Sequence, residues 1–243
     1  MLSSRSLEIL VLSLSRCGAR SVPTSAQLPS NAERRPIGAR SWRASQVAAD
    51  ALVRLGVTAN SISIAGMLAG LVAGLALAGT SSLDGLAQRV TWLAGAGCIV
   101  LRLLANMFDG MVAIGSGKAS RVGELYNEVP DRISDTATLI GLGYAAGGHP
   151  ALGYLAALAA VFTAYIRAMG KAAGTGQDFG GPFAKPQRMW CVIGCAVYCG
   201  LAPAGWQPAF GLPAAVAAIV AVGGLYTALG RLRRIALKLR NTA

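Results

Sequence analysis

The chain has 243 residues, of which 54% are hydrophobic and only 13% are charged, whereas an ordinary soluble domain carries about 25% charged residues. This composition excludes a disordered chain and argues against a water-soluble enzyme. The formal net charge is +12, which by itself suits either a nucleic acid or an anionic membrane surface as a partner.

The N-terminal part of the chain is not typical of a membrane span. Residues 1–40 are rich in Ser and Arg, and we expect them to form a disordered basic arm. Between Trp42 and Leu55 apolar side chains then recur at helical spacing. This period predicts an amphipathic helix that lies on the membrane, with its arginines toward lipid phosphates.

Six apolar stretches follow, at 58–79, 90–112, 132–147, 150–168, 189–203 and 209–229. Each approaches the ~20 residues that cross a hydrocarbon core, although the third and fifth are short. The sequence therefore predicts an all-α, polytopic membrane protein with six transmembrane helices. We expect a membrane domain over 41–235 and a basic C-terminal tail over 236–243.

Lys and Arg are distributed unequally between the predicted loops. Twenty of the 22 basic residues fall in the two terminal segments and in the second and fourth loops, which lie on one side of the membrane. By the positive-inside rule this side is cytoplasmic. The pattern predicts a protein of a bacterial inner membrane with both termini in the cytoplasm. It also explains the net charge, so no nucleic acid is expected as a partner.

The first apolar stretch carries Gly66, Gly70 and Gly74 at four-residue intervals. Such a stripe of small residues lets helix backbones approach closely in lipid. We interpret it as a packing surface, either within the bundle or between two subunits.

Half of the ten acidic residues lie between 109 and 135. Asp109 ends the second apolar stretch and Asp131 begins the third, so both meet the same cytoplasmic loop. Asn106 is one helical turn before Asp109, and Asn127 is one turn before Asp131. Ionisable groups at a membrane edge indicate a functional site. Two helices that face each other with these oxygens predict a cage for Mg²⁺ or Mn²⁺.

The same residues resemble the signature of the CDP-alcohol phosphatidyltransferase family, D-x2-D-G-x2-A-R-x8-G-x3-D-x3-D. The spacing is kept from Asn106 to Asp131, within a resemblance that covers roughly residues 40–235. Asn106 and Asn127 stand where the family has carboxylates, and Ile114 stands where it has Arg. The retained positions are Asp109, Gly110, Ala113, Gly123 and Asp131.

The resemblance implies a membrane enzyme of phospholipid biosynthesis. Together with the glycine stripe, it also suggests a homodimer. The enzyme would transfer a phosphatidyl or phospho-alcohol group from CDP-diacylglycerol, or another CDP-linked donor, to an alcohol with release of CMP. Asn106, Asp109 and Asn127 would be metal positions. Asp131 would be the general base and would also be a ligand of the metal. The small residues Gly110, Ala113 and Gly123 would let the substrate approach the backbone.

The two asparagines predict a weakened metal site, because an amide oxygen can bind Mg²⁺ but neutralises no charge. We expect one ion bound strongly, or a second only when the donor diphosphate supplies oxygens. Glu124 and Glu128 are candidates to compensate, and the alternative is that they are simply solvated. Arg102 is expected to pair with Asp109 or Asp135 in the bundle.

The fourth loop adds four cations on the side of the acids, Arg167, Lys171, Lys185 and Arg188. One or more of them, first of all Arg167 and Lys171, are predicted to bind a phosphate of the donor or acceptor, and the alternative is ordinary positive-inside charge. Two other functions stay open. The asparagines would suit an inactive relative that acts as a membrane scaffold. A small-molecule transporter is less consistent, since the polar residues gather at one membrane face.

Overall fold

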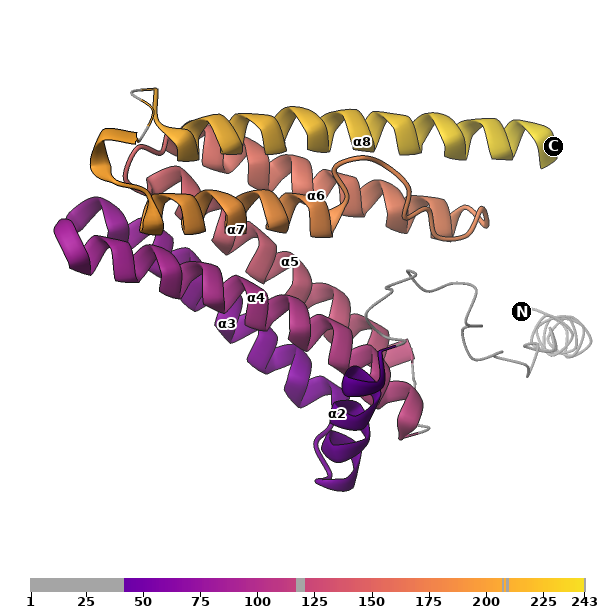
Figure 1. Cartoon of the computed structure of the whole chain (residues 1–243). Coiled ribbons are helices and arrows are strands. Elements are labelled where there is room, and N and C mark those ends of the chain that lie inside the picture. Colours follow the sequence, from indigo (N-terminus) through magenta and orange to yellow (C-terminus); the bar gives the residue numbers. More distant parts are fainter. Residues whose placement is uncertain (1–41, 117–120, 207, 209, 243) are drawn as a thin grey trace, which may run out of the picture. The chain divides into compact units, whose positions relative to one another are not determined.

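A computed structural model of the chain (Figure 1) describes residues 42–116, 121–206, 208 and 210–242, and every regular element in these ranges is a helix. The all-α prediction is confirmed for this part of the chain, and the predicted basic arm at 1–40 lies outside it. The α-helices are α2 (Arg43–Arg54), α3 (Ala59–Gly79), α4 (Gly85–Gly115), α5 (Arg121–Tyr144), α6 (Pro150–Ala172), α7 (Lys185–Leu201) and α8 (Leu212–Thr242). Two 3₁₀ turns, η3 (Thr80–Ser82) and η4 (Ala204–Trp206), join α3 to α4 and α7 to α8.

The ends of these helices follow from local chemistry. The Thr58 hydroxyl caps α3 by accepting a hydrogen bond from the Ser61 N–H at 3.1 Å. Pro150 and Pro186 lie in the first turns of α6 and α7, where a backbone N–H needs no partner within the helix. Gly147, with a φ of 74°, permits the tight turn between α5 and α6.

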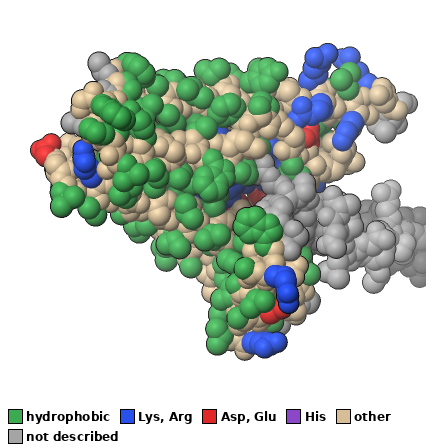
Figure 2. All heavy atoms as spheres, viewed as in Figure 1, with side chains coloured by type: hydrophobic (Ala, Val, Ile, Leu, Met, Phe, Trp, Pro, Cys, Tyr) green, Lys and Arg blue, Asp and Glu red, His purple; other side chains and the backbone are tan. Residues whose placement is uncertain are grey.

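Four helices are long and apolar enough to cross a membrane, namely α3 with η3, α4, α6 and α8. Charged side chains fill the first half of α5, and α7 has only 17 residues, so neither meets that standard. Figure 2 shows apolar side chains over most of the visible face, with Lys and Arg near the C-terminal end of α8 and on α2. The protein is therefore an integral membrane protein. The residues after 235 continue α8 as a helix to Thr242.

The helices pack in two groups that share α5. Helix α3 lies against α4 and α5, while α6 lies against α5 and α8, and α7 rests on α4 and α8 (Figure 1). A core of buried apolar side chains joins both groups and includes Trp92 and Ile99 of α4 with Leu139 and Leu142 of α5.

The predicted glycine stripe packs within the chain. A Cβ added to Gly66 would lie 2.7 Å from the Ala105 Cβ of α4, and one added to Gly70 would lie 2.3 Å from the Ser134 Cβ of α5. Gly74 meets the α5 backbone in the same way. The stripe therefore brings α3 against the ends of α4 and α5 that carry the acidic residues. A role between subunits stays a prediction.

Candidate active site

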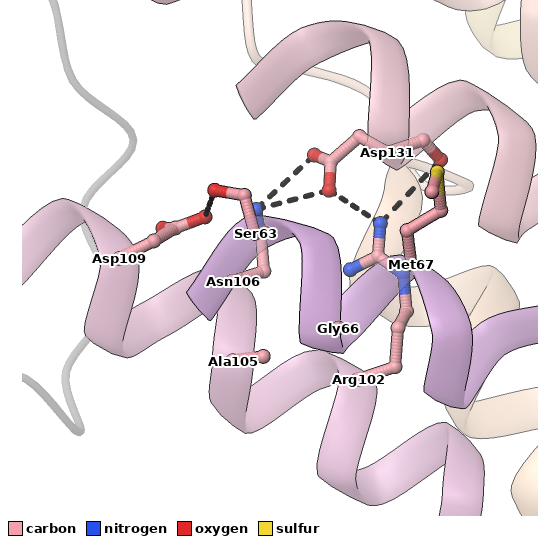
Figure 3. A pocket seen from close by; sticks show the side chains of 8 residues that line it. All are labelled: Ser63, Gly66, Met67, Arg102, Ala105, Asn106, Asp109 and Asp131. Carbon is pink, nitrogen blue, oxygen red and sulfur yellow. Dashed lines mark hydrogen bonds and ion pairs between the residues drawn. The ribbon is translucent and has the colours of Figure 1, made fainter. Parts of the chain in front are cut away.

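Three helices build a small pocket at the polar ends of α4 and α5. Figure 3 shows Asn106, Asp109 and Asp131 turned toward one another, with the α3 residue Ser63 beside Asp109. The other residues that line the pocket are Gly66, Met67, Arg102 and Ala105. The structure thus brings together the side chains that the sequence spacing placed on facing helices.

Asp109 is the least compensated charge of this pocket. Its side chain is buried, and Oδ2 accepts a hydrogen bond from the Ser63 hydroxyl at 2.7 Å. Its other oxygen, Oδ1, is buried without a hydrogen-bond partner in the described part of the chain. The donors to this carboxylate, the Ser63 hydroxyl and the Gly110 N–H, are both neutral. A buried carboxylate without a cation is costly, so this oxygen is available to one.

Asp131, in contrast, has two cations beside its carboxylate. Its Oδ1 forms an ion pair with Arg102, and its Oδ2 lies 2.5 Å from the Lys185 ammonium. Both oxygens also accept from the Asn106 amide nitrogen at 3.1 Å. Arg102 is 2% exposed and lies 3.3 Å from Asp135 as well. The predicted pairing of Arg102 with Asp135 is confirmed, and Asp131 is its second partner.

The two asparagines connect three helices. The Asn106 amide nitrogen donates to Asn127 Oδ1 at 3.2 Å, which joins α4 to α5. The Asn106 Oδ1 atom accepts from the Lys185 ammonium at 3.2 Å, which joins α4 to α7. The side-chain oxygens of Asn106 and Asn127 are thus already hydrogen-bonded.

Two of the predicted phosphate-binding cations, Arg167 and Lys171, do not line this pocket. Arg167 of α6 places Nη2 within 2.5 and 2.6 Å of the two Glu128 carboxylate oxygens, and its guanidinium lies 5.3 Å from the centroid of the Phe179 ring. Glu128 also pairs with Arg132 at 2.9 Å. Glu128 therefore neutralises two arginines, while Lys171, four residues after Arg167, is exposed. The Glu124 side chain lies outside the described residues.

The small residues of the signature are half-buried positions near the polar ends of the two helices. Gly110 and Ala113 follow Asp109 on α4, and Gly123 begins α5. They do not line the pocket of Figure 3.

Two residues of the cluster were missed from the sequence. The sequence predicts Lys185 only as one of the phosphate-binding cations of the fourth loop, and it predicts no role for Ser63. A weak signal existed for Ser63, since it is a polar residue one turn into an apolar helix. No pattern in the sequence places the start of α7 beside α4 and α5.

In this arrangement of side chains, the oxygen atoms of the cluster can bind at most one divalent ion. Across the described residues no three His, Cys, Asp or Glu side chains gather as a metal site, so amide oxygens would have to complete it. The free oxygen of Asp109 is a suitable anionic ligand for Mg²⁺ or Mn²⁺. The Asp131 oxygens are already held by two cations.

No family model matches the chain. The curated relatives include the phosphatidylinositol phosphate synthase of Mycobacteroides abscessus, which is 31% identical over 63% of this chain and 67% of its own length. The protein of the same name from Mycobacterium marinum is 30% identical over 68% of each chain. The inner membrane protein YnbA of Escherichia coli is 27% identical over 54% of this chain and 63% of its own length.

Solved structures resemble the chain over a greater length. The Mycobacterium tuberculosis phosphatidylinositol phosphate synthase with CDP-DAG bound superposes with a TM-score of 0.64 at 27% identity, over 80% of this chain and 94% of that one. The same synthase in complex with manganese and citrate gives a TM-score of 0.64 at 26% identity, over 78% of this chain and 88% of that one.

Proposed function

Because this chain belongs to the CDP-alcohol phosphatidyltransferase family, we propose that the cluster of Asn106, Asp109, Asn127 and Asp131 is its active site. The chain is a membrane enzyme of phospholipid biosynthesis that transfers a phosphatidyl group from a CDP-linked donor to an alcohol and releases CMP. The observation that carries the proposal is the convergence of Asp109 and Asp131 in one pocket at the polar ends of α4 and α5.

The proposed donor is CDP-diacylglycerol, because a solved relative holds it. The proposed cofactor is Mg²⁺ or Mn²⁺, held by Asp109. A bound divalent ion would neutralise charge on the donor diphosphate and stabilise the departing CMP. Gly110, Ala113 and Gly123 are proposed to let the donor approach the two helices.

Asp131 is proposed to accept the proton of the acceptor hydroxyl. As that oxygen bonds to the lipid-side phosphorus, the bond from this phosphorus to the CMP oxygen breaks. Arg102 and Asn106 hold the carboxylate of Asp131 in place. Because the carboxylate is already held in place, no conformational entropy is lost in positioning it during the reaction.

The acceptor is an alcohol, and the names of the curated relatives make inositol phosphate the first one to test. Arg167 and Lys171 are proposed to attract a phosphorylated acceptor to this side of the membrane. For Arg167 this role requires a phosphate to compete with Glu128 for the guanidinium. We also propose a homodimer, on the resemblance to the family.

The proposed topology has six spans and cytoplasmic termini. Helices α5 and α7 each pack against helices that are long enough to cross the membrane, which supports their crossing as well. Helix α2 is proposed to lie on the membrane surface, since Trp42, Val47 and Leu55 are exposed apolar side chains. The site would then face the cytoplasm.

A second candidate function is an inactive membrane scaffold. It is favoured by the two asparagines and by the engagement of both Asp131 oxygens with cations. A carboxylate in two ion pairs is a weaker base than a free one.

Purified protein in detergent distinguishes the two functions. It is incubated with CDP-diacylglycerol, Mg²⁺ or Mn²⁺, and one acceptor at a time from inositol phosphate, glycerol phosphate, inositol and serine. The enzyme is expected to release CMP with one acceptor and to form the matching lipid. Absence of CMP with every acceptor and both metals would contradict the proposed function and favour the scaffold.

A further inference from the structure

The two carboxylates of the pocket differ in how their charge is neutralised. Asp109 has neutral donors only, the Ser63 hydroxyl and the Gly110 N–H, and its buried Oδ1 has no hydrogen-bond partner among the described side chains. Asp131 has two cations and an amide. The two carboxylates face the same pocket, but only Asp109 has an oxygen that an incoming metal ion could bind without displacing a cation.

The cation that makes the difference is Lys185, at the first position of α7. Its ammonium lies 2.5 Å from Asp131 Oδ2 and 3.2 Å from Asn106 Oδ1. These two oxygens belong to two of the four positions of the predicted cage. The Lys185 side chain is 10% exposed, so its charge is directed into the cluster and away from solvent.

A divalent ion and this ammonium cannot share these oxygens. Mg²⁺ or Mn²⁺ binds carboxylate and amide oxygens at about 2.0–2.2 Å. An ion at that distance from Asp131 Oδ2 and Asn106 Oδ1 would lie close to the Lys185 nitrogen, and Arg102 would add repulsion from the far side of Asp131. Asp109 forms no ion pair with either cation among the described residues, although the Lys185 charge still acts on its carboxylate from a greater distance.

We infer that Lys185 is a tethered cation of this site, which holds Asp131 and Asn106 in place of a divalent ion and leaves one ion position, at Asp109. This inference rests on the proposed function for its metal. It assigns a role to a residue outside the signature stretch, and it explains how Asn at position 106 is accommodated. An uncharged amide there accepts from the ammonium and donates to Asp131 at once.

Titration with Mn²⁺ alone, followed by the electron paramagnetic resonance signal of the free ion, tests the inference on the full chain. The wild type is expected to bind one ion per chain. Asn106→Asp with Asn127→Asp is expected to bind one as well, because Lys185 still holds its oxygens. Adding Lys185→Gln is expected to raise the number to two. Lys171→Gln in the same double variant is the matched control, expected to stay at one.

Two ions in the double variant that keeps Lys185, or one in the triple variant, would overturn the inference. A wild-type crystal soaked in Mn²⁺ tests the same inference and does not depend on whether the variants fold. One anomalous peak is expected beside Asp109, and a peak ligated by Asp131 with Lys185 displaced would overturn the inference. CMP release is measured separately. If no CMP is released but each variant binds the expected number of Mn²⁺ ions, only the proposed function is contradicted. If CMP is released but the number of bound Mn²⁺ ions differs from the expected one, only the role of Lys185 is contradicted.

Discussion

Asp131 and Asp109 have different surroundings, and these suit the different tasks that we propose for them. Asp131 is held by Arg102, Lys185 and Asn106, so it has a fixed position. Asp109 keeps one oxygen without a partner, so it can accept a cation. A site that separates positioning from metal binding requires fewer acidic residues than one in which every position is a carboxylate.

The role of Asp131 can be separated from its ion pairs by comparison with Asp135. Asp131→Asn is expected to lower turnover by about 10²–10⁴-fold, the usual contribution of a general base. It also leaves Arg102 and Lys185 beside a neutral amide, which should cost about 3–5 kcal/mol of stability. Turnover is therefore measured per folded molecule, with thermal melting in parallel.

Asp135→Asn is the matched control, since Asp135 also pairs with Arg102 but forms no ion pair with Lys185 and no hydrogen bond with Asn106 among the described residues. It is expected to lower the melting temperature and to keep turnover within tenfold of the wild type. Equal losses of turnover in both variants would assign Asp131 a structural role only.

A second residue-scale prediction concerns the loop before α7. Partial burial would raise the pKa of Asp178, but hydrogen bonds from Arg234 and the Gly180 N–H lower it below its ordinary value of 3.8. Its charged form therefore stabilises the fold above about pH 4, and this contribution is lost as the pH falls through the lowered pKa. Arg234 is 45% exposed, so we expect about 1 kcal/mol or less.

The measurement compares melting of the wild type and Asp178→Asn at pH 7 and pH 3. The wild type should melt higher at pH 7, and the gap should narrow at pH 3. A gap of unchanged size at pH 3 would mean that the charge of Asp178 is not its source.

The convergence of Asn106, Asp109 and Asp131 could be predicted because it depends on spacing within two neighbouring helices. The partners of Asp131 could be predicted only in part. Arg102 is on the same helix as Asn106, so its reach into the cluster is readable. Lys185 comes from α7, and a contact between residues 54 positions apart depends on how α7 packs against α4 and α5. No periodicity in the sequence contains that information.

At the scale of helices, the glycine stripe on α3 determines how closely the site can assemble. A Cβ on Gly74 would lie 2.4 Å from the Ala137 carbonyl oxygen of α5, while one on Gly97 of α4 would meet nothing within 4 Å. Gly74→Ala is therefore expected to push α3 from α5 and cost about 1–3 kcal/mol through overpacking. Gly97→Ala should be neutral, or stabilise by up to about 1 kcal/mol through helix propensity.

Thermal melting of the two variants in the same detergent checks this pair. A melting temperature for Gly74→Ala at or above that of Gly97→Ala would show that the α3–α5 contact is not tight.

The sequence predicts only part of the role of the glycine stripe. Four-residue spacing identified a packing surface, but the choice between packing within the chain and packing between subunits depends on which helix faces the glycines.

Each of the six apolar stretches coincides at least in part with one of the helices α3 to α8, because hydrophobic length is a local property. Among the described residues, four of these helices are long and apolar enough to cross a membrane. The boundaries differ at the polar ends. Helix α5 begins at Arg121, well before the stretch at 132–147, and α4 extends from Gly85 to Gly115. Helical backbone continues into the polar region, where hydropathy has no signal. The extension of α5 carries Asn127 and Asp131, whereas Asn106 and Asp109 lie inside the predicted stretch at 90–112.

For the whole molecule, the distribution of charge predicts orientation. A full-length chain with green fluorescent protein at its C-terminus should fluoresce in bacterial cells, and one with alkaline phosphatase there should be inactive. Phosphatase inserted at Leu83, in the turn between α3 and α4, should be active. The reverse pattern would place the site on the opposite side of the membrane from its nucleotide donor.

The central claim is that Asp109 belongs to the phosphatidyl-transfer site of this membrane bundle. The most direct measurement is CMP release from CDP-diacylglycerol, in Mn²⁺ and the best acceptor, by the wild type and by Asp109→Asn at matched amounts of folded protein. We predict that the variant loses at least about 100-fold in rate, the scale on which a metal or electrostatic contact acts, and needs more Mn²⁺. A variant that releases CMP at the wild-type rate and with the same Mn²⁺ dependence would contradict the account.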